Sequence, residues 1–290
     1  MPRLQVRVLH GPFHARLPAV PQGIDWTREL ASVDGRIVPA AEATVPATDD
    51  GLLRGDGAFE VVRVYRGRPF ALGDHLDRLR RSLENLRLAS SFDRDRITAR
   101  IAALLEQRDA RGFDGALRIV ITRGGHELLL TEPIELRPAA IRLALVTYAP
   151  PRILDGVKSL SYAANMLAGR LARERGFDEA LLVTPHGRVL EAPTASFFWV
   201  DRDGQLCTPP LDEHILASIT RDRLIALLDV VERPITRDEL ASGREAFLAS
   251  TTREVQAVSA IEDTVFPAPG EVTRRAAELL SKRIASELAA

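Results

Sequence analysis

The basic side chains of this chain are almost all arginine. Of 39 lysine and arginine residues, only Lys158 and Lys282 are lysine. Arginine keeps its proton near neutral pH, whereas a desolvated lysine can lose its proton and act as a nucleophile or form a Schiff base. Amine chemistry in this protein would therefore have to use one of two residues.

The surroundings of the two lysines differ. Lys282 belongs to TRRAAELLSKRIASELAA, which predicts an amphipathic C-terminal helix and a solvated lysine. Lys158 follows Gly156 in DGVKSLSYAANMLAG, on a short extended segment before a predicted helix. Partial desolvation there would lower the pKa of its ammonium group toward the range useful for Schiff-base formation. A surface lysine at a strand end is the alternative interpretation.

Glu191 is the acidic residue best placed for chemistry. It ends a predicted strand in GRVLEAPTASFF and precedes a loop of small residues, so that its carboxylate could face a cleft. A carboxylate paired to a pyridinium nitrogen keeps that nitrogen protonated. A solvated turn residue is the alternative interpretation of Glu191 taken alone.

Two hydroxyl-bearing segments suit an anion. Thr220 precedes a predicted helix in SITRDRLIALL, and Thr251 and Glu254 in ASTTREV have the Thr-x-x-Glu spacing of a capping box. Helix N-termini bind phosphate through unpaired backbone N–H groups and the helix dipole. Arg78, in DHLDRL, could supply a fixed positive charge. Helix capping without a ligand, and a solvated helix face for Arg78, are the alternatives.

The elements that must position these residues predict an α/β fold of two domains with a cleft between them. Apolar spacing predicts helices at 74–88, 94–109 and 163–175, and strands at 59–65, 116–122, 141–148 and 179–184. The prolines and glycine of APPRILDG favour an interdomain linker. We expect an N-terminal extension, a small N-terminal α/β domain, the linker and a C-terminal cofactor-binding domain, at residues 1–29, 30–148, 149–156 and 157–290.

Composition excludes several classes of protein. The 290 residues carry a net charge of −1, which disfavours binding to nucleic acid or to an anionic membrane. No apolar run approaches the roughly 18 to 20 residues that span a bilayer. The single cysteine, Cys207, excludes an internal disulfide and a multi-cysteine metal cluster, so we expect no metal. The first residues lack the apolar segment of a secretory signal, which predicts a cytoplasmic protein.

The order of these features resembles the class IV aminotransferases, the fold-type IV pyridoxal-phosphate enzymes. That family includes branched-chain and D-amino acid aminotransferases, (R)-selective amine transaminases and aminodeoxychorismate lyase. The resemblance runs from about Ala31 to the C-terminus through five ordered blocks: GLLRGDGAFEVVRVYRGRPF, DHLDRLRRSLENL, VKSLSYAANMLA, GFDEALLVTPHGRVLEAPTASFFWV, and ILASITRDRL with FLASTTREVQAV.

The resemblance implies a pyridoxal 5'-phosphate cofactor and a homodimer with shared active sites. It makes Lys158 the Schiff-base lysine, Arg78 the phosphate-binding arginine and Glu191 the partner of the pyridine nitrogen. Tyr162 would donate a hydrogen bond to the phenolic oxygen of the cofactor. The remaining implied contacts are Ile219 through its backbone, Thr220, Ser250 and Thr251 around the cofactor, and Thr252 near the substrate.

The implied reaction moves an amino group between an amino acid, or a primary amine, and a 2-oxo acid. The alternative within the family is a lyase that converts 4-amino-4-deoxychorismate to 4-aminobenzoate and pyruvate, because the same cofactor serves both reactions. Features of the subfamilies conflict. Phe59 resembles the branched-chain enzymes, but Arg54 stands where those enzymes usually carry an aromatic residue, and RGDGAFE and VITRGG resemble the lyase and D-amino acid branches.

Arginines near these motifs are candidates for the substrate carboxylate, because a guanidinium matches a carboxylate in two-point geometry. Structural or dimer-interface ion pairs are the alternative role for these side chains. The residues expected to contact substrate, besides Thr252, are Phe59, Arg54, Arg63, Arg123 and His126.

Overall fold

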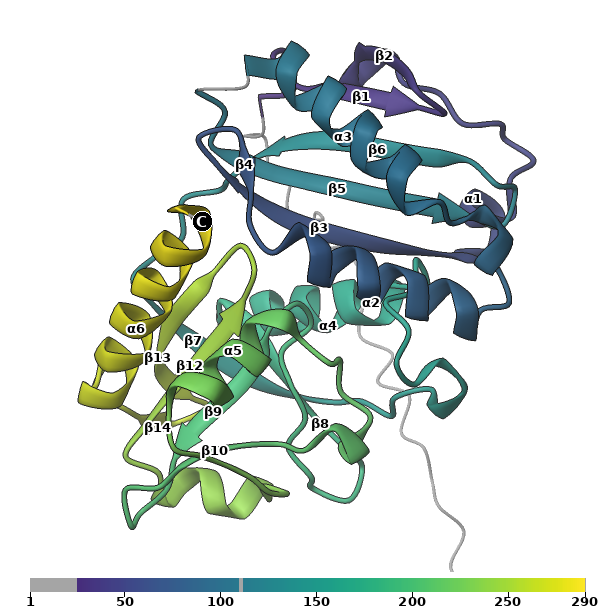
Figure 1. Cartoon of the computed structure of the whole chain (residues 1–290). Coiled ribbons are helices and arrows are strands. Elements are labelled where there is room, and N and C mark those ends of the chain that lie inside the picture. The colour runs from purple at the N-terminus through teal and green to yellow at the C-terminus, as the bar shows by residue number, and fades with distance from the viewer. Residues whose placement is uncertain (1–24, 110–111, 290) are drawn as a thin grey trace, which may run out of the picture.

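The computed structural model describes residues 25–109 and 112–289, so most of the predicted extension at 1–29 lies outside the described residues. Two β-sheets with helices packed on them form the molecule (Figure 1). The predicted α/β class is confirmed. Among the described residues, none of the helices is both long and apolar enough to cross a membrane.

The first sheet has six strands in the order β2-β1-β6-β5-β3-β4, each antiparallel to its neighbours. Helices α2 and α3 share a core with it, and α2 lies along β3 (Figure 1). The elements are β1 (Leu30–Val33), β2 (Arg36–Pro39), α1 (Asp50–Arg54), β3 (Gly57–Tyr65), β4 (Arg68–Pro69), α2 (Leu72–Asn85), α3 (Arg94–Asp109), β5 (Gly115–Thr122) and β6 (Glu127–Pro133).

Alternation along β3 separates two faces of this sheet. Val62 and Val64 are fully buried in the core formed with α2 and α3, as the alternating sequence predicts. Phe59 and Val61 therefore point to the opposite face, which lies toward the second sheet. The apolar spacing that predicts the 74–88 helix is confirmed as a leucine stripe along α2, since Leu76, Leu79 and Leu83 belong to the same core.

The second sheet has the order β11-β10-β9-β12-β13-β7-β8, and β14 pairs with β13. Its parallel pairs are β10–β11, β7–β13 and β7–β8. The strands are β7 (Ala140–Thr147), β8 (Glu179–Val183), β9 (Ser196–Val200), β10 (Leu206–Thr208), β11 (Val230–Glu232), β12 (Glu245–Ser250), β13 (Glu254–Ile261) and β14 (Thr264–Val265).

Helices cover one face of the second sheet. α5 (Ile219–Leu227) and α6 (Glu271–Ala289) pack on Phe198 and Phe247, and α4 (Ala163–Glu174) packs on β7 and β8. Phe197 and Trp199, the alternate residues of β9, enter a separate core on the other face. The uninterrupted apolar run FFWV, at residues 197–200, reflects this burial on both faces. Short 3-10 helices span Ala40–Glu42, Ala89–Ser91, Arg152–Leu154, Leu211–Glu213 and Arg237–Ser242.

The chain crosses between the sheets earlier than the predicted linker. β7 was expected in the first domain, but it pairs with β13 and β8 in the second sheet. The crossing therefore lies between β6 and β7, at residues 134–139, whereas 149–156 follows β7. Backbone pairing with strands far along the chain decided the place of β7, and local proline and glycine content does not report such pairing.

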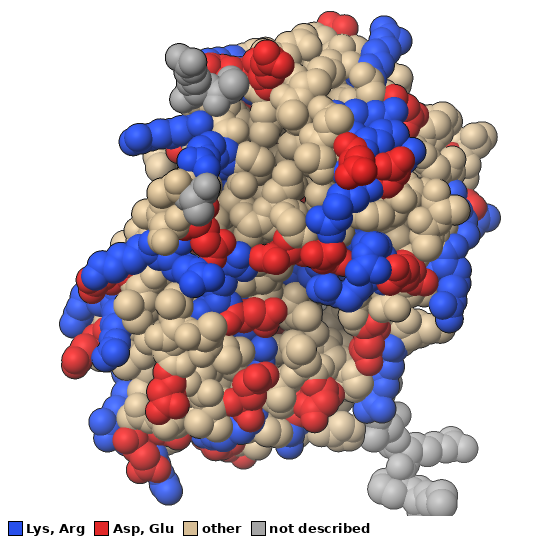
Figure 2. All heavy atoms as spheres, viewed as in Figure 1, with Lys and Arg blue, Asp and Glu red and all other residues tan. Residues whose placement is uncertain are grey.

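Ion pairs and hydrogen bonds connect the two sheet layers. Arg223 on α5 pairs with Asp74 on α2 at 2.8 Å, and the Tyr65 hydroxyl donates to Glu254 at 2.8 Å. Charged side chains of both signs mix over the face drawn in Figure 2, with a mixed band across its middle. These contacts join the helix and strand of one layer to those of the other.

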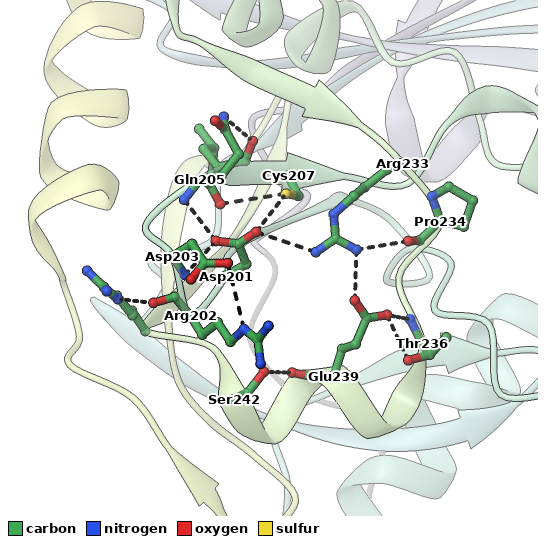
Figure 3. Close-up of polar contacts among 12 residues, drawn as sticks. Asp201, Arg202, Asp203, Gln205, Cys207, Arg233, Pro234, Thr236, Glu239 and Ser242 are labelled. Atoms are coloured by element: carbon green, nitrogen blue, oxygen red, sulfur yellow. Dashed lines mark hydrogen bonds and ion pairs between the residues drawn. The ribbon is translucent and has the colours of Figure 1, made fainter.

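A polar cluster at the far edge of the second sheet surrounds the cysteine (Figure 3). Arg233 donates to Glu239 at 2.9 Å, and the Asp201 carboxylate lies 3.6 Å from the same guanidinium. The buried Cys207 thiol faces Asp201, and burial raises its pKa. Thr236 and Glu239 form a capping box. This cluster ties the end of β11 to the loop after β9.

Candidate active site

Lys158 lies against the first sheet although it belongs to the chain after β7. Phe59 N–H donates to the Lys158 carbonyl at 3.0 Å, and Ser82 Oγ on α2 accepts from Lys158 N–H at 3.1 Å. The close approach requires Gly57, because a Cβ there would lie 2.4 Å from the Ile121 carbonyl and 2.7 Å from Leu160. The segment is thus held beside β3 by an isolated β-bridge between Ala58 and Ser159.

Aromatic rings surround the Lys158 amine. Its Nζ lies 4.4 Å from the centre of the Phe59 ring and 5.6 Å from that of Tyr162. Burial, together with the positive charge of Arg78, lowers the pKa of Lys158 to about 8. The predicted desolvation of this lysine is therefore present in the structure.

Glu191 is enclosed in the same region. Leu216 N–H donates to its Oε1 at 3.1 Å, and Glu191 forms no ion pair among residues 25–109 and 112–289. Burial raises the pKa of this carboxyl to about 7, against the opposing effect of the Leu216 N–H group. An enclosed carboxylate without a cation is energetically costly, so a positively charged group would be stabilised beside it.

Arg78 is buried on α2 and connects that helix with β3 and with the segment before α5. Its Nε and Nη2 each donate to Glu60 on β3 at 2.7 Å, and its Nη1 donates to the Ala217 carbonyl at 2.8 Å. Ala217 directly precedes Ser218, the N-cap of α5, whose side chain accepts from Arg221 N–H. A guanidinium and a helix N-terminus therefore meet at one place, which favours an anion.

One cavity of about 430 Å³ contains most of these groups, a volume within the range of ligand sites. Lys158, Glu191, Tyr162 and Arg78 line it from both sheet layers. Its other walls come from the first sheet, the crossing segment and the loops of the second sheet: Trp26, Phe59, Val61, Ala116, Arg118, Glu132, Pro133, Ile134, Glu135, Arg137, Met166, Ala192, Pro193, Thr194, Ala195, Ser196, Leu216, Ser218, Ser250, Thr251 and Thr252.

The hydroxyl-bearing segments differ in detail from their predicted geometry. Thr220 lies within the first turn of α5 and is buried, next to Ile219. The helix expected to begin at Thr251 is wrong, because Ser250 pairs with Glu254 and residues 251–253 form the turn between β12 and β13. Continuous antiparallel pairing of the two strands leaves no room for a helical turn. Ser250, Thr251 and Thr252 nevertheless line the cavity.

Tyr162 is the N-cap residue of α4, and its ring packs edge-on against Phe59 at 5.4 Å. Its hydroxyl donates to the Pro193 carbonyl at 2.6 Å. Burial and the nearby Glu191 raise the pKa of this phenol, so the hydroxyl keeps its proton. Tyr162 therefore offers a neutral hydroxyl at the cavity wall.

The four side chains expected to read a carboxylate lie outside the lining of this cavity and pair elsewhere on the same chain. Arg54 pairs with Asp50, Arg63 with Asp114, and Arg123 with Asp56. His126 Nδ1 lies 2.8 Å from Asp34. Phe59 and Thr252, from the same set, do line the cavity.

Two arginines that the sequence analysis did not single out line the cavity instead. Arg118 lies over the Phe59 ring and pairs with Glu132, and Arg137 lies on the crossing segment. Alternation along β5 could have identified Arg118, because Leu117 and Ile119 belong to the core and Arg118 must point to the other face. No local pattern marks Arg137.

Comparison with known proteins decides the family. The family model described as amino-transferase class IV matches residues 57–261, which is most of the chain. The chain belongs to the class IV aminotransferases. It is a transaminase of this class, and its fold is the fold type IV of its structural neighbours.

Several members of this family resemble this aminotransferase over most of its length. A Methanocaldococcus jannaschii protein with the provisional name branched-chain-amino-acid aminotransferase is 32% identical over 271 residues, covering 85% of this chain and 93% of the relative. D-alanine aminotransferase of Bacillus licheniformis is 29% identical over 279 residues, covering 88% and 97%. Aminodeoxychorismate lyase of Bacillus subtilis is 26% identical over 277 residues, covering 87% and 93%.

Among solved structures, a mutant branched-chain amino acid aminotransferase from Thermobaculum terrenum superposes with a TM-score of 0.79 at 29% identity. The match covers 90% of this aminotransferase and 94% of that chain. The two-layer arrangement is thus shared along nearly the whole of both chains.

Proposed function

We propose that this aminotransferase binds pyridoxal 5'-phosphate and moves an amino group between an amino acid, or a primary amine, and a 2-oxo acid. The proposal rests on one juxtaposition: the desolvated Lys158 and the enclosed Glu191 line the same cavity. The cofactor, when bound, supplies an electron sink that stabilises negative charge at the substrate carbon.

The residues present fit this cofactor at both ends. Glu191 lacks a cationic partner among the described residues, and a protonated ring nitrogen would supply one. At the other end, Arg78, Ser218 and the hydroxyls around Thr251 suit a phosphate group, with the backbone N–H groups of Ile219 and Thr220 beside them.

Lys158 would hold the cofactor covalently and then transfer the proton from the substrate carbon. A pKa of about 8 leaves roughly a tenth of Lys158 unprotonated at pH 7, which suits a group that must act as both acid and base. The rings of Phe59 and Tyr162 lie beside its Nζ and form an apolar wall there. Tyr162 would keep a neutral hydroxyl close to the cofactor ring.

The test uses pyridoxal 5'-phosphate itself. We expect the purified protein to bind it with a visible absorption band, and borohydride reduction to fix it on the peptide that contains Lys158, as read by mass spectrometry. Titration with L-amino acids, D-amino acids and (R)-amines then identifies the donor from loss of the band. Absence of the band, or fixation elsewhere, would contradict the proposal.

The substrate carboxylate would be bound by Arg118 in this chain's own cavity, because Arg118 lies over Phe59. Arg54, Arg63, Arg123 and His126 remain candidates through the cavity of a second subunit. Thr252, in the turn that lines the cavity, would face the same end of the substrate.

A homodimer with shared active sites is part of the proposal. Large apolar side chains are exposed on α1 and α4: Leu52, Leu53, Met166, Leu167 and Leu171. Met166 also lines the cavity, so a partner packed on α4 would border the active site.

The second candidate function is a lyase that releases pyruvate from 4-amino-4-deoxychorismate. The observation in its favour is the likeness to the Bacillus subtilis lyase over 87% of this chain. The two reactions differ in the products of a single assay. Pyruvate and 4-aminobenzoate formed without an amino acceptor indicate the lyase, whereas amino transfer that requires a 2-oxo acid indicates the transaminase.

A further inference from the structure

A fully buried carboxylate lies behind the cavity wall. Glu60 is 0% exposed and points from β3 to the side of the sheet covered by α2, opposite to Phe59. It accepts two hydrogen bonds from Arg78, both at 2.7 Å, and its Oε2 lies 2.8 Å from His75 Nδ1. Arg78 lines the cavity, whereas Glu60 and His75 do not.

These contacts fix the plane of the Arg78 guanidinium. Arginine has five N–H donors, and here Nε–H and one N–H of Nη2 donate to Glu60, while one N–H of Nη1 donates to Ala217. One N–H group on each terminal nitrogen is left over. Because two-point pairing sets the plane and Ala217 sets the tilt, these two donors have defined directions.

The charges of the cluster make it a rigid unit. Burial alone would raise the pKa of Glu60, but the charge of Arg78 and the hydrogen bonds from Arg78 and His75 lower it to about 2. Burial lowers the pKa of His75, so the ring stays neutral and donates from Nδ1. His75 Nε2 is buried and has no partner among the described residues. The cluster therefore holds one cation, Arg78, and one anion, Glu60, and Arg78 is the member that faces the cavity.

We propose that Glu60 is a positioning residue: with His75, it holds Arg78 in the orientation that binds the phosphate group of the cofactor. This inference rests on the proposed function, which supplies the phosphate. Glu60 acts through Arg78 and touches neither the cofactor ring nor the substrate. It therefore controls the part of the binding energy that comes from the phosphate.

A merely structural role would have a different signature. Loss of a structural contact would loosen the whole cavity and weaken every ligand alike. Loss of positioning would weaken only ligands that carry the phosphate. Pyridoxal 5'-phosphate and pyridoxal differ in this group alone, so the ratio of their dissociation constants reports the orientation of Arg78.

The first test is E60Q, with both dissociation constants measured on the apoprotein. We expect pyridoxal 5'-phosphate to bind about 10- to 100-fold more weakly, as when other positioning partners are removed, and pyridoxal to change little. E29Q is the matched control, because Glu29 is also buried in a two-point pair, with Arg108. Equal losses for both ligands in E60Q, or none for either, would overturn the proposal.

Two further variants keep the test valid if E60Q does not fold. E60D retains the negative charge but withdraws the carboxylate by one methylene, and we expect the same selective loss. R78K retains the positive charge, but a lysine ammonium group cannot make the two-point contact of a guanidinium. If Glu60 acts through Arg78, E60Q/R78K loses no more phosphate selectivity than R78K alone, whereas additive losses would contradict the proposal. Wild type that binds neither ligand would instead contradict the proposed function.

Discussion

Phe59 and Glu60 are neighbours on β3, and their side chains point to opposite faces of the first sheet. Phe59 lies 4.4 Å from Lys158 Nζ in the cavity, and Glu60 pairs with Arg78 beneath α2. One strand therefore positions both the amine and the guanidinium that line the cavity. The pleat, which sends successive side chains to opposite faces, makes this possible.

Lys158→Ala should abolish covalent capture of pyridoxal 5'-phosphate and lower turnover by at least roughly 10²- to 10⁴-fold, the usual contribution of a proton-transferring group. Capture is measured by mass spectrometry after borohydride reduction. Lys282→Ala is the matched control, because Lys282 is the other lysine and its amine is exposed on α6. Unchanged turnover in the Lys158 variant would contradict the mechanism.

The rate of covalent capture should rise with pH around a midpoint near 8. Burial and the charge of Arg78 lower the pKa of Lys158 from 10.5 to about 8, and only the unprotonated amine attacks a carbonyl. The rate is followed by stopped-flow absorbance from pH 6 to 10. A midpoint near the ordinary lysine value of 10.5 would show that Lys158 is solvated.

Glu191→Gln should stabilise the cofactor-free protein at pH 8 and impair the loaded enzyme. The pKa of Glu191 is about 7 in the folded protein and 4.5 ordinarily. The contribution of Glu191 to the free energy of unfolding is therefore complete below pH 4.5 and is lost as pH rises through 7. The gain in unfolding free energy at pH 8 should be about 3 kcal/mol. Urea unfolding at pH 8 and 4.5 measures it, and a gain of equal size at both pH values would contradict the assignment.

Arg118→Gln should lower kcat/KM for amino acid donors by about 10- to 100-fold, the equivalent of one charged hydrogen-bonded contact. Primary amines without a carboxylate should be affected much less, because they make no contact with the guanidinium. Arg80→Gln serves as the control: Arg80 pairs with Glu84 at 2.7 Å on the exposed face of α2, away from the cavity lining. Equal losses for both kinds of donor in the Arg118 variant would exclude Arg118 as the carboxylate reader.

Leu167→Glu should shift the protein from dimer to monomer. Leu167 is 48% exposed on α4, and a charge buried at an apolar interface is strongly unfavourable. Light scattering coupled to size-exclusion chromatography measures the mass. Val265→Glu, at a 79% exposed position on β14, should leave the mass unchanged. A dimer that persists in the Leu167 variant would place the interface on another surface.

Much of this protein could be predicted from local sequence. The scarcity of lysine directed attention to Lys158, and the leucine stripe of α2 and the alternation of β3 predicted the elements beside it. These signals are local, because helical and strand periodicities determine which side chains share a face wherever the element packs. The ordered blocks around Glu191 and Thr251 indicated the family, because a sequence motif is also a local signal.

Only the tertiary structure decided which of these groups meet. It moved β7 into the second sheet, replaced the expected helix at Thr251 by a turn, and placed Arg118 in the cavity where Arg63 was expected. It also paired Glu60 with Arg78, two residues 18 positions apart on different elements. Strand pairing and the packing of α2 on the sheet bring together segments that are distant in the sequence. The desolvation of Lys158 and Glu191 depends on all the segments that surround them, so a local sequence pattern cannot predict it.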